Sequence, residues 1–131
     1  MATQLSVEIV TPEASVFSGS ALEVVLPAWD GQLGVLPDHD ALLSLLRAGP
    51  CEVRDDTGSK LWIIGRGFAD IGGDHVTLLT DQAIPVDQVD KASAQADLAA
   101  ATADAESHPL GSEAQKAAAI RAEWAQALID A

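Results

Sequence analysis

An abrupt change in composition at Pro85 constrains the fold of this 131-residue chain more than any other feature. Before Pro85, short runs alternate apolar and polar residues and are separated by Gly-rich turns. From Asp87 onward the residues are mostly Ala, Gln, Asp, Glu and Lys, with no Gly until Gly111. Short alternating runs are typical of a β-sandwich or barrel, whereas Ala-rich segments favour helix. The sequence therefore predicts an α+β chain, with an all-β domain over residues 1–86 and a helical segment over residues 87–131.

The β domain is predicted from alternation with a period of two. The clearest case is Leu5, Val7 and Ile9, which alternate with polar residues and end before Pro12. The run Leu42–Leu46 is apolar without alternation, so either a short helix or a buried strand fits it. Other expected strands cover residues 16–19, 22–26, 51–54, 61–64, 69–71 and 76–80, the last of these being the final strand before the helices.

The stretch 27–39 contains the residues with the most specific backbone requirements. Gly31 and Gly34 bracket Gln32 and Leu33, which we expect to form a two-residue turn, because glycines at such spacing indicate positive φ or close backbone approach. Apolar runs lie on both sides. A turn of this kind on a rigid sandwich is a usual place for a binding surface, and the alternative is a structural hairpin without a partner.

The segment after Pro85 predicts two antiparallel helices. Asp87 is a plausible N-cap for the first, and Ser112 with Gln115 forms a capping box for the second. The short break at 108–111 implies a hairpin, and its Ala-rich faces bury little area, so we expect loose docking. The expected apolar stripes are Val89, Ala92, Ala96, Ala99 and Ala103 on the first helix, and Ile120, Trp124 and Leu128 on the second.

Charge and cysteine content exclude several functions. Twenty acidic against seven basic residues give a formal charge of −13, which argues against nucleic-acid binding and against direct contact with anionic lipid. Cys51 is the single cysteine, so there is no disulfide framework, and a buried inert thiol is expected. No basic leader and no long apolar run is present, which favours a soluble protein in a reducing cytoplasm.

Asp38, His39 and Asp40 form the one group that resembles a catalytic or metal site. On a strand, however, the two carboxylates would point away from the imidazole. Gly65-Arg66-Gly67 is too short for a phosphate loop, and the common hydrolase and dinucleotide motifs are missing. We therefore expect no enzyme activity, no metal and no cofactor. The alternative is a free-standing acidic β-sandwich binding module or small enzyme that uses Asp38, His39 and Asp40.

Four ordered motifs resemble the epsilon subunit of F-type ATP synthases, which is called delta in mitochondria. The resemblance runs nearly end to end and includes the two-helix tail. The motifs are Val10-Thr11-Pro12-Glu13 through Gly19, Gly31-x-x-Gly34-Val35-Leu36-Pro37-x-His39, Leu42-Leu43 through Gly49, and Gly67 through Val76-Thr77-Leu78-Leu79 to Ala83-Ile84.

The resemblance implies a flattened β-sandwich of about ten strands followed by an antiparallel helical hairpin. It implies a non-catalytic central-stalk (rotor) subunit of a proton- or ion-translocating enzyme, which couples the gamma subunit to the ring of c subunits. The complex would lie at the cytoplasmic side of the inner (plasma) membrane, with this chain peripheral. The implied interface residues are Asp30, Gln32, Leu33 and His39.

The resemblance also implies that the tail helices regulate ATP hydrolysis and contact the catalytic alpha and beta subunits. The residues concerned are Ile120, Arg121, Trp124 and Leu128. Some relatives bind ATP between these helices, and the matching candidates here are Asp87, Lys91 and Arg121. Asp90 stands where that motif has Arg, and the second helix has a net negative charge. We therefore expect weak ATP binding at most and weak inhibition.

Overall fold

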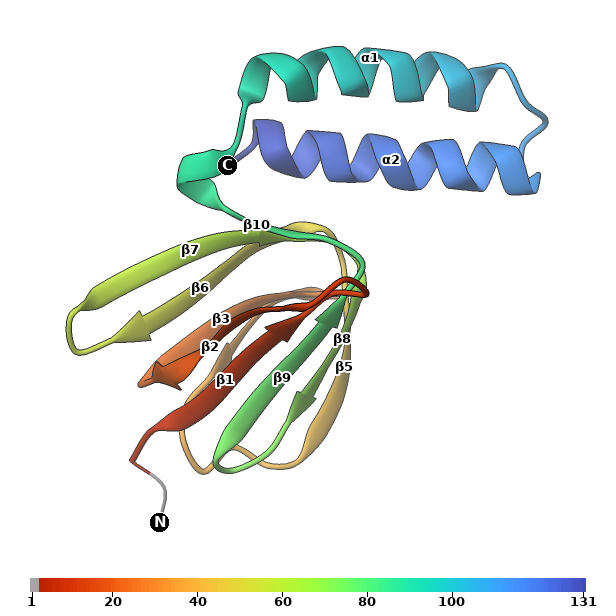
Figure 1. Ribbon diagram of the computed structural model, residues 1–131. Coiled ribbons are helices and arrows are strands. Elements are labelled where there is room, and N and C mark those ends of the chain that lie inside the picture. Colours follow the sequence, from red (N-terminus) through yellow and green to blue (C-terminus); the bar gives the residue numbers. More distant parts are fainter. Residues whose placement is uncertain (1–2) are drawn as a thin grey trace. The chain divides into compact units, whose positions relative to one another are not determined.

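The structure is a computed structural model that describes residues 3–131. The chain divides into two compact units, of which the first ends at Val86 and the second covers Asp87–Ala131. The first unit contains all the strands and the second contains the two α-helices (Figure 1).

The first unit is a ten-stranded sheet that curls into a flattened sandwich. The strands follow the order β10-β7-β6-β3-β5-β8-β9-β1-β2, and β4 pairs with β3 away from this path. All pairs are antiparallel except β1 with β9. The strands are β1 Leu5–Val10, β2 Ser15–Ala21, β3 Glu23–Ala28, β4 Gly31–Val35, β5 Leu42–Leu46, β6 Gly49–Asp55, β7 Gly58–Ile64, β8 Gly67–Ile71, β9 His75–Thr80 and β10 Ala83–Pro85.

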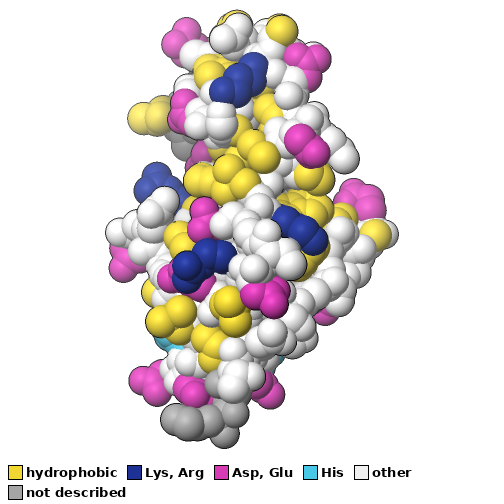
Figure 2. All heavy atoms as spheres, turned by 90° about the vertical axis from the view of Figure 1, so that its left-hand side faces the viewer, with side chains coloured by type: hydrophobic (Ala, Val, Ile, Leu, Met, Phe, Trp, Pro, Cys, Tyr) yellow, Lys and Arg dark blue, Asp and Glu magenta, His cyan; other side chains and the backbone are white. Residues whose placement is uncertain are grey.

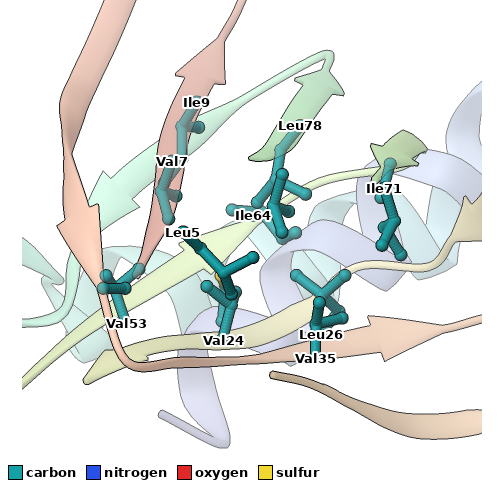
Figure 3. Close-up of a cluster of buried hydrophobic side chains, with 14 of the residues drawn as sticks. Leu5, Val7, Ile9, Val24, Leu26, Val35, Val53, Ile64, Ile71 and Leu78 are labelled. Atoms are coloured by element: carbon teal, nitrogen blue, oxygen red, sulfur yellow. The ribbon is translucent and has the colours of Figure 1, made fainter. Parts of the chain in front are cut away.

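The core of this unit follows from the alternation in the sequence. Because successive side chains of a strand point to opposite faces, every second residue of β1 reaches the interior. Leu5, Val7 and Ile9 are fully buried there, and Figure 3 shows them converging with Val24, Leu26 and other side chains from across the sheet. The core consists of aliphatic residues and Cys51, and the partly buried Phe17 and Trp62 pack against it.

Three parts of the β unit either differ from the sequence-based expectation or decide between alternatives that it left open. Gln32 and Leu33 were expected in a turn, but they lie in β4 and pair with Pro27 and Leu26. The run Leu42–Leu46 is strand β5, because it pairs along its whole length with β8. A further short strand, β10, follows β9 and pairs with β7. Cross-strand pairing between distant segments decided each of these cases. Such pairing cannot be predicted from the local periodicity of the sequence.

The second unit is an antiparallel helical hairpin (Figure 1). Helix α1 covers Lys91–Glu106 and α2 covers Glu113–Ile129, and a 3-10 turn, η1, covers Val86–Gln88. The expected N-cap Asp87 is wrong, since η1 contains it and Asp90 caps α1 by accepting a hydrogen bond from the Ser93 N–H at 3.1 Å. Ser112 caps α2 as expected, accepting from the Gln115 N–H at 3.2 Å.

An alanine seam joins the two helices. Ala94 and Ala101 of α1 are buried, as are Ala118 and Ala125 of α2. Ala94 and Ala125 lie equally far along the chain from the connection between the helices, and so do Ala101 and Ala118, as an antiparallel hairpin requires. The expected stripe on α1 is therefore wrong, because Ala92, Ala96, Ala99 and Ala103 are exposed. So many α1 positions are Ala that sequence periodicity cannot select the buried ones.

Candidate functional site

The β3–β4 hairpin presents the turn Trp29-Asp30 at one end of the sandwich. Gly31 ends the turn with φ of +136°, which an L-residue rarely adopts, so glycine is required by conformation. A Cβ at this position would have no neighbour within 4 Å. Asp30 and Gln32 are exposed, whereas Leu33 points to the other face and packs against the core.

An open hollow of about 530 Å³ lies beside this turn. It brings together three of the expected interface residues, Asp30, Gln32 and Leu33, with the apolar run of β5. Leu43 and Leu45 of that run are 71% and 60% exposed. Exposed apolar side chains gathered beside a hollow are typical of a contact surface. The full lining is Ala28, Trp29, Asp30, Gln32, Leu33, Leu42, Leu43, Ser44 and Leu45.

Trp29 makes cation–π contacts with two arginines that the sequence pattern did not indicate. The guanidinium carbons of Arg47 and Arg66 both lie over the Trp29 ring, each 6.0 Å from its centroid. Trp29 itself is 59% exposed. A cation–π contact at an exposed site contributes about 0.5–1 kcal/mol. The scarcity of basic residues, of which the chain has seven, was the feature of the sequence that could have drawn attention to these two arginines.

The first unit has two further basic residues, Arg54 and Lys60. Figure 2 shows acidic and basic side chains interspersed with hydrophobic ones on one face of the molecule. In the first unit, Arg54 pairs with Glu23 at 2.6 Å, and Lys60 lies over the Phe17 ring at 5.5 Å from its centroid. We call Trp29, Arg47 and Arg66 the cationic-aromatic cluster.

His39, the fourth expected interface residue, lies at the other end of the sandwich. The Trp29 N–H donates to the Leu45 carbonyl at 3.0 Å, near the end of β5, whereas His39 precedes the start of β5 at Leu42. The five residues of β4 separate the two sites by roughly 17 Å at about 3.3 Å per residue. The structure therefore divides the expected interface into two surfaces.

The segment Asp38–Asp40 is a loop and not the strand that the sequence analysis considered. Asp38 has φ of +68°, and its N–H donates to the Gly73 carbonyl at 2.7 Å. The Nδ1 atom of His39 lies 2.7 Å from the backbone carbonyl of Asp40, not from a carboxylate. Within residues 3–131, no group of three or more His, Cys, Asp or Glu side chains could hold a metal ion.

A second histidine cluster, which sequence reasoning missed, lies at the β8–β9 turn. His75 Nδ1 is 3.1 Å from Asp74 Oδ1, and His75 Nε2 is 3.7 Å from Asp70 Oδ1. The contact with Asp74 is the main cause of a raised pKa for His75, and Asp70 adds to it. The two carboxylates flank a hairpin turn, so only the pairing of β8 with β9 brings Asp70 to the imidazole.

Cys51 lies in the core and is fully buried, as the alternating pattern predicts. Burial raises the pKa of its thiol to about 12, with a smaller contribution from Glu52. The thiolate is the reactive form, so this cysteine is inert at neutral pH.

The candidate ATP ligands Asp87, Lys91 and Arg121 are not gathered in the hairpin. Arg121 of α2 donates to Asp104 of α1, and the same carboxylate contacts His108 Nε2 at 3.0 Å. Hydrogen bonds from His108 and Arg121 hold the pKa of Asp104 below its ordinary value. Lys91 is at the start of α1, roughly 20 Å along the helix from Asp104 at about 1.5 Å per residue.

The expected regulatory face of α2 lies outside the alanine seam. Ile120 is exposed, and Trp124 and Leu128 are half-buried, whereas Ala118 and Ala125 fill the contact with α1. The four-residue spacing does put the three large residues on one side of α2. None of the helices in residues 3–131 is long and apolar enough to cross a membrane.

The comparisons with known proteins agree with this architecture. Residues 4–86 match the family described as "ATP synthase, Delta/Epsilon chain, beta-sandwich domain". The ATP synthase epsilon chain of Synechococcus sp. (strain WH7803) is 44% identical over 97 residues, which cover 74% of this chain and 71% of the relative. The epsilon chain of Maricaulis maris (strain MCS10) is 34% identical over 124 residues, covering 95% of this chain and 93% of the relative.

Solved structures with the same fold include chains of two mitochondrial ATP synthases. A chain in the Euglena gracilis mitochondrial ATP synthase structure titled OSCP/F1/c-ring aligns with a TM-score of 0.82 at 21% identity, covering 98% of this chain and 81% of its own length. A chain in the Tetrahymena thermophila mitochondrial ATP synthase structure titled central stalk/c-ring aligns with a TM-score of 0.64 at 16% identity. The alignment covers 98% of this chain and 96% of that chain.

A β-sandwich followed by a helical hairpin, with an exposed apolar and cationic surface, defines a protein that acts through contacts with other chains. The family match covers most of the chain, and the Maricaulis maris relative is similar along nearly its full length. The chain therefore belongs to the ATP synthase delta/epsilon family, whose members are non-catalytic subunits. The resemblance drawn from the motifs and the predicted fold class are both confirmed.

Proposed function

We propose that this chain is a central-stalk subunit that couples the gamma subunit to the ring of c subunits in a proton- or ion-translocating ATP synthase. The family match over residues 4–86 carries the proposal. The chain is peripheral in the membrane-bound complex, on the cytoplasmic side of the membrane, and it contacts protein rather than lipid or nucleic acid, in keeping with its charge of −13.

The two ends of the sandwich suit two partners. The end formed by Trp29, Asp30 and Gln32 faces the ring, as the resemblance implies for this edge. The end formed by His39 faces gamma. A subunit that couples two neighbours needs two separate contact surfaces, and the length of β4, roughly 17 Å, separates the two ends.

Site-directed cross-linking in the assembled enzyme tests this arrangement. We expect Asp30→Cys and Gln32→Cys to form disulfides with cysteines placed in the c-subunit loop, and His39→Cys to form them with gamma. The native Cys51 need not be removed, because its buried thiol is unreactive. Thr57→Cys, at the exposed β6–β7 turn, is the matched control and should give neither product.

Two outcomes would contradict the proposal in different ways. If position 32 cross-linked to catalytic subunits and never to c, the orientation would be wrong. If the chain failed to assemble with gamma and the ring at all, the stalk function itself would be wrong.

We further propose that the helical hairpin regulates ATP hydrolysis weakly. Helix α2 and its C-cap Asp130 contain Lys116 and Arg121 against Glu113, Glu123 and Asp130, and Arg121 is already paired with Asp104. Contacts with acidic segments of alpha and beta subunits would depend on Ile120, Trp124 and Leu128 instead. Inhibition of ATP hydrolysis would then come from burial of these apolar residues against the alpha and beta subunits.

A further inference from the structure

The cationic-aromatic cluster brings two of the chain's seven basic residues to one exposed indole ring. The chain has twenty acidic residues, so two guanidinium groups within cation–π distance of the same ring form a local concentration of basic groups. Asp30, in the same turn, is the one acidic residue that lines the adjoining hollow. A partner that meets this end of the sandwich therefore meets two guanidinium groups and the carboxylate of Asp30.

The surface next to the cluster is apolar and continuous across four strands. Leu45 pairs with Phe68, Phe68 with Leu79, and Leu79 with Val10, so these side chains form one row on the same face of the sheet. Leu45, Phe68 and Leu79 are all more than 40% exposed. Such a row has no polar group to bind a phosphate chain or a sugar, and it fits an apolar side chain of another protein.

We propose that the cluster and the hollow together bind an acidic segment of a neighbouring protein, in which a carboxylate lies next to an apolar side chain. The carboxylate pairs with the guanidinium of Arg47, and the apolar side chain enters the hollow beside Leu43 and Leu45. The planar fork of an arginine binds a carboxylate with two hydrogen bonds. The identification of the neighbour as a rotor subunit rests on the proposed function above.

An anionic lipid surface would also attract two arginines beside a tryptophan. We favour protein because polybasic segments that hold proteins to lipid carry four to eight basic residues, and this chain is strongly acidic overall. Vesicle binding therefore becomes an outcome of the test.

The first measurement is the affinity of the full chain for the purified complex of gamma with the c-ring. We expect Arg47→Gln to weaken binding about tenfold, which corresponds to about 1.4 kcal/mol, and Arg47→Glu to weaken it further. The matched control is Lys60→Gln, which removes the same charge from a cation–π pair elsewhere on the sandwich and should change affinity less than twofold. Added salt should reduce the difference between wild type and Arg47→Gln.

The second measurement identifies the carboxylate directly. Arg47→Lys supplies an amine at the cluster, and a zero-length carbodiimide couples an amine only to a carboxylate in contact with it. We expect an interchain amide at position 47 to an acidic residue of the partner, located by mass spectrometry. Arg54→Lys, beside Glu23 at the start of β3, is the control and should give no such product.

Each outcome has a defined consequence. If Arg47→Gln binds as tightly as Lys60→Gln, or if carbodiimide yields no interchain product in a complex that has formed, the acidic-segment proposal is overturned while the stalk function stands. Pelleting of the wild-type chain with phosphatidylglycerol vesicles, and its loss in Arg47→Gln, would assign the cluster to lipid and also overturn it. If the wild-type chain does not bind the gamma–ring complex, the proposed function fails first.

Discussion

Gly31 shows how one backbone angle holds the contact end of the sandwich in place. Its φ of +136° closes the Trp29-Asp30 turn, and a side chain there would have space but the wrong backbone preference. We expect Gly31→Ala to lower the free energy of unfolding by about 1–3 kcal/mol, the range for a residue held in a sparsely populated conformation.

Chemical denaturation of the two variants Gly31→Ala and Gly73→Ala measures this cost. Gly73 is the control, because its φ is not positive and its added Cβ would lie at ordinary contact distance, 3.7 Å from the nearest atom. Equal losses in both variants would contradict a conformational role for Gly31.

His75 makes the stability of the β unit depend on pH. Its pKa is raised in the folded state, chiefly by Asp74, so the folded state favours the protonated imidazole. The stabilisation is fully present below the unfolded pKa near 6.5 and is lost as the pH rises through the folded pKa. We expect the stability difference between wild type and His75→Gln to be larger at pH about 5.5 than at pH about 8.5.

The same measurement on His39→Gln is the control, since the His39 ring contacts a backbone carbonyl and not a carboxylate. Thermal or urea unfolding at several pH values provides the data. A pH-independent difference for His75→Gln would mean that the two carboxylates do not stabilise the charged ring.

At the scale of elements, the alanine seam decides how closely α1 and α2 approach. Ala101 is buried in the seam, whereas Ala99, which the sequence pattern favoured, is exposed. We expect Ala101→Leu to destabilise the hairpin by about 1–3 kcal/mol through overpacking. Ala99→Leu should be nearly neutral, because it adds a good helix former at an exposed position.

Hydrogen exchange of the α1 and α2 amides in the full chain measures the stability of the hairpin separately from that of the β unit. Faster exchange in Ala99→Leu than in Ala101→Leu would show that the helices meet through the other stripe.

The hairpin should bind ATP weakly or not at all. The carboxylate of Asp90 occupies the N-terminus of α1, where a phosphate would otherwise bind, and Arg121 is held by Asp104. The loss of a charge-assisted contact costs roughly 1.5–3 kcal/mol. Calorimetry should therefore give no dissociation constant below about 1 mM, the range of weak affinities, and a tighter value would contradict this expectation.

For the whole molecule, the division at Val86 predicts that the two units are separable. The hydrophobic core of the β unit consists entirely of residues between Leu5 and Ala83. We expect a chain truncated after Val86 to fold, as judged by circular dichroism, and to keep its affinity for gamma. In the assembled enzyme, truncation should raise ATP hydrolysis less than about threefold, since ~0.6 kcal/mol corresponds to that factor.

The full-length chain in the same enzyme is the reference. A tenfold rise in hydrolysis on truncation would mean that Ile120, Trp124 and Leu128 sustain strong inhibition without help from charge. An unfolded fragment would mean that the core of the β unit depends on the helices.

The sequence by itself determined the fold class, because two periodicities that differ in physical origin meet at Pro85. Alternation of Leu5, Val7 and Ile9 follows from the pleat of a strand, and the cap at Ser112 follows from the unpaired N–H groups of a helix start. Both are local effects. The motifs around Gly31 and Gly34 also pointed to the correct family without any tertiary information.

Only the tertiary structure decided where the contact residues meet. Pairing of β4 with β3 moved Gln32 and Leu33 out of a turn and onto opposite faces. The length of β4 separated His39 from Asp30, and the proximity of β5 and β8 ends brought Arg47 and Arg66, far apart in the chain, over Trp29. These contacts depend on strand register and on side chains that are distant in sequence. Interactions over such separations produce no periodic pattern in the sequence, so the sequence alone does not predict them.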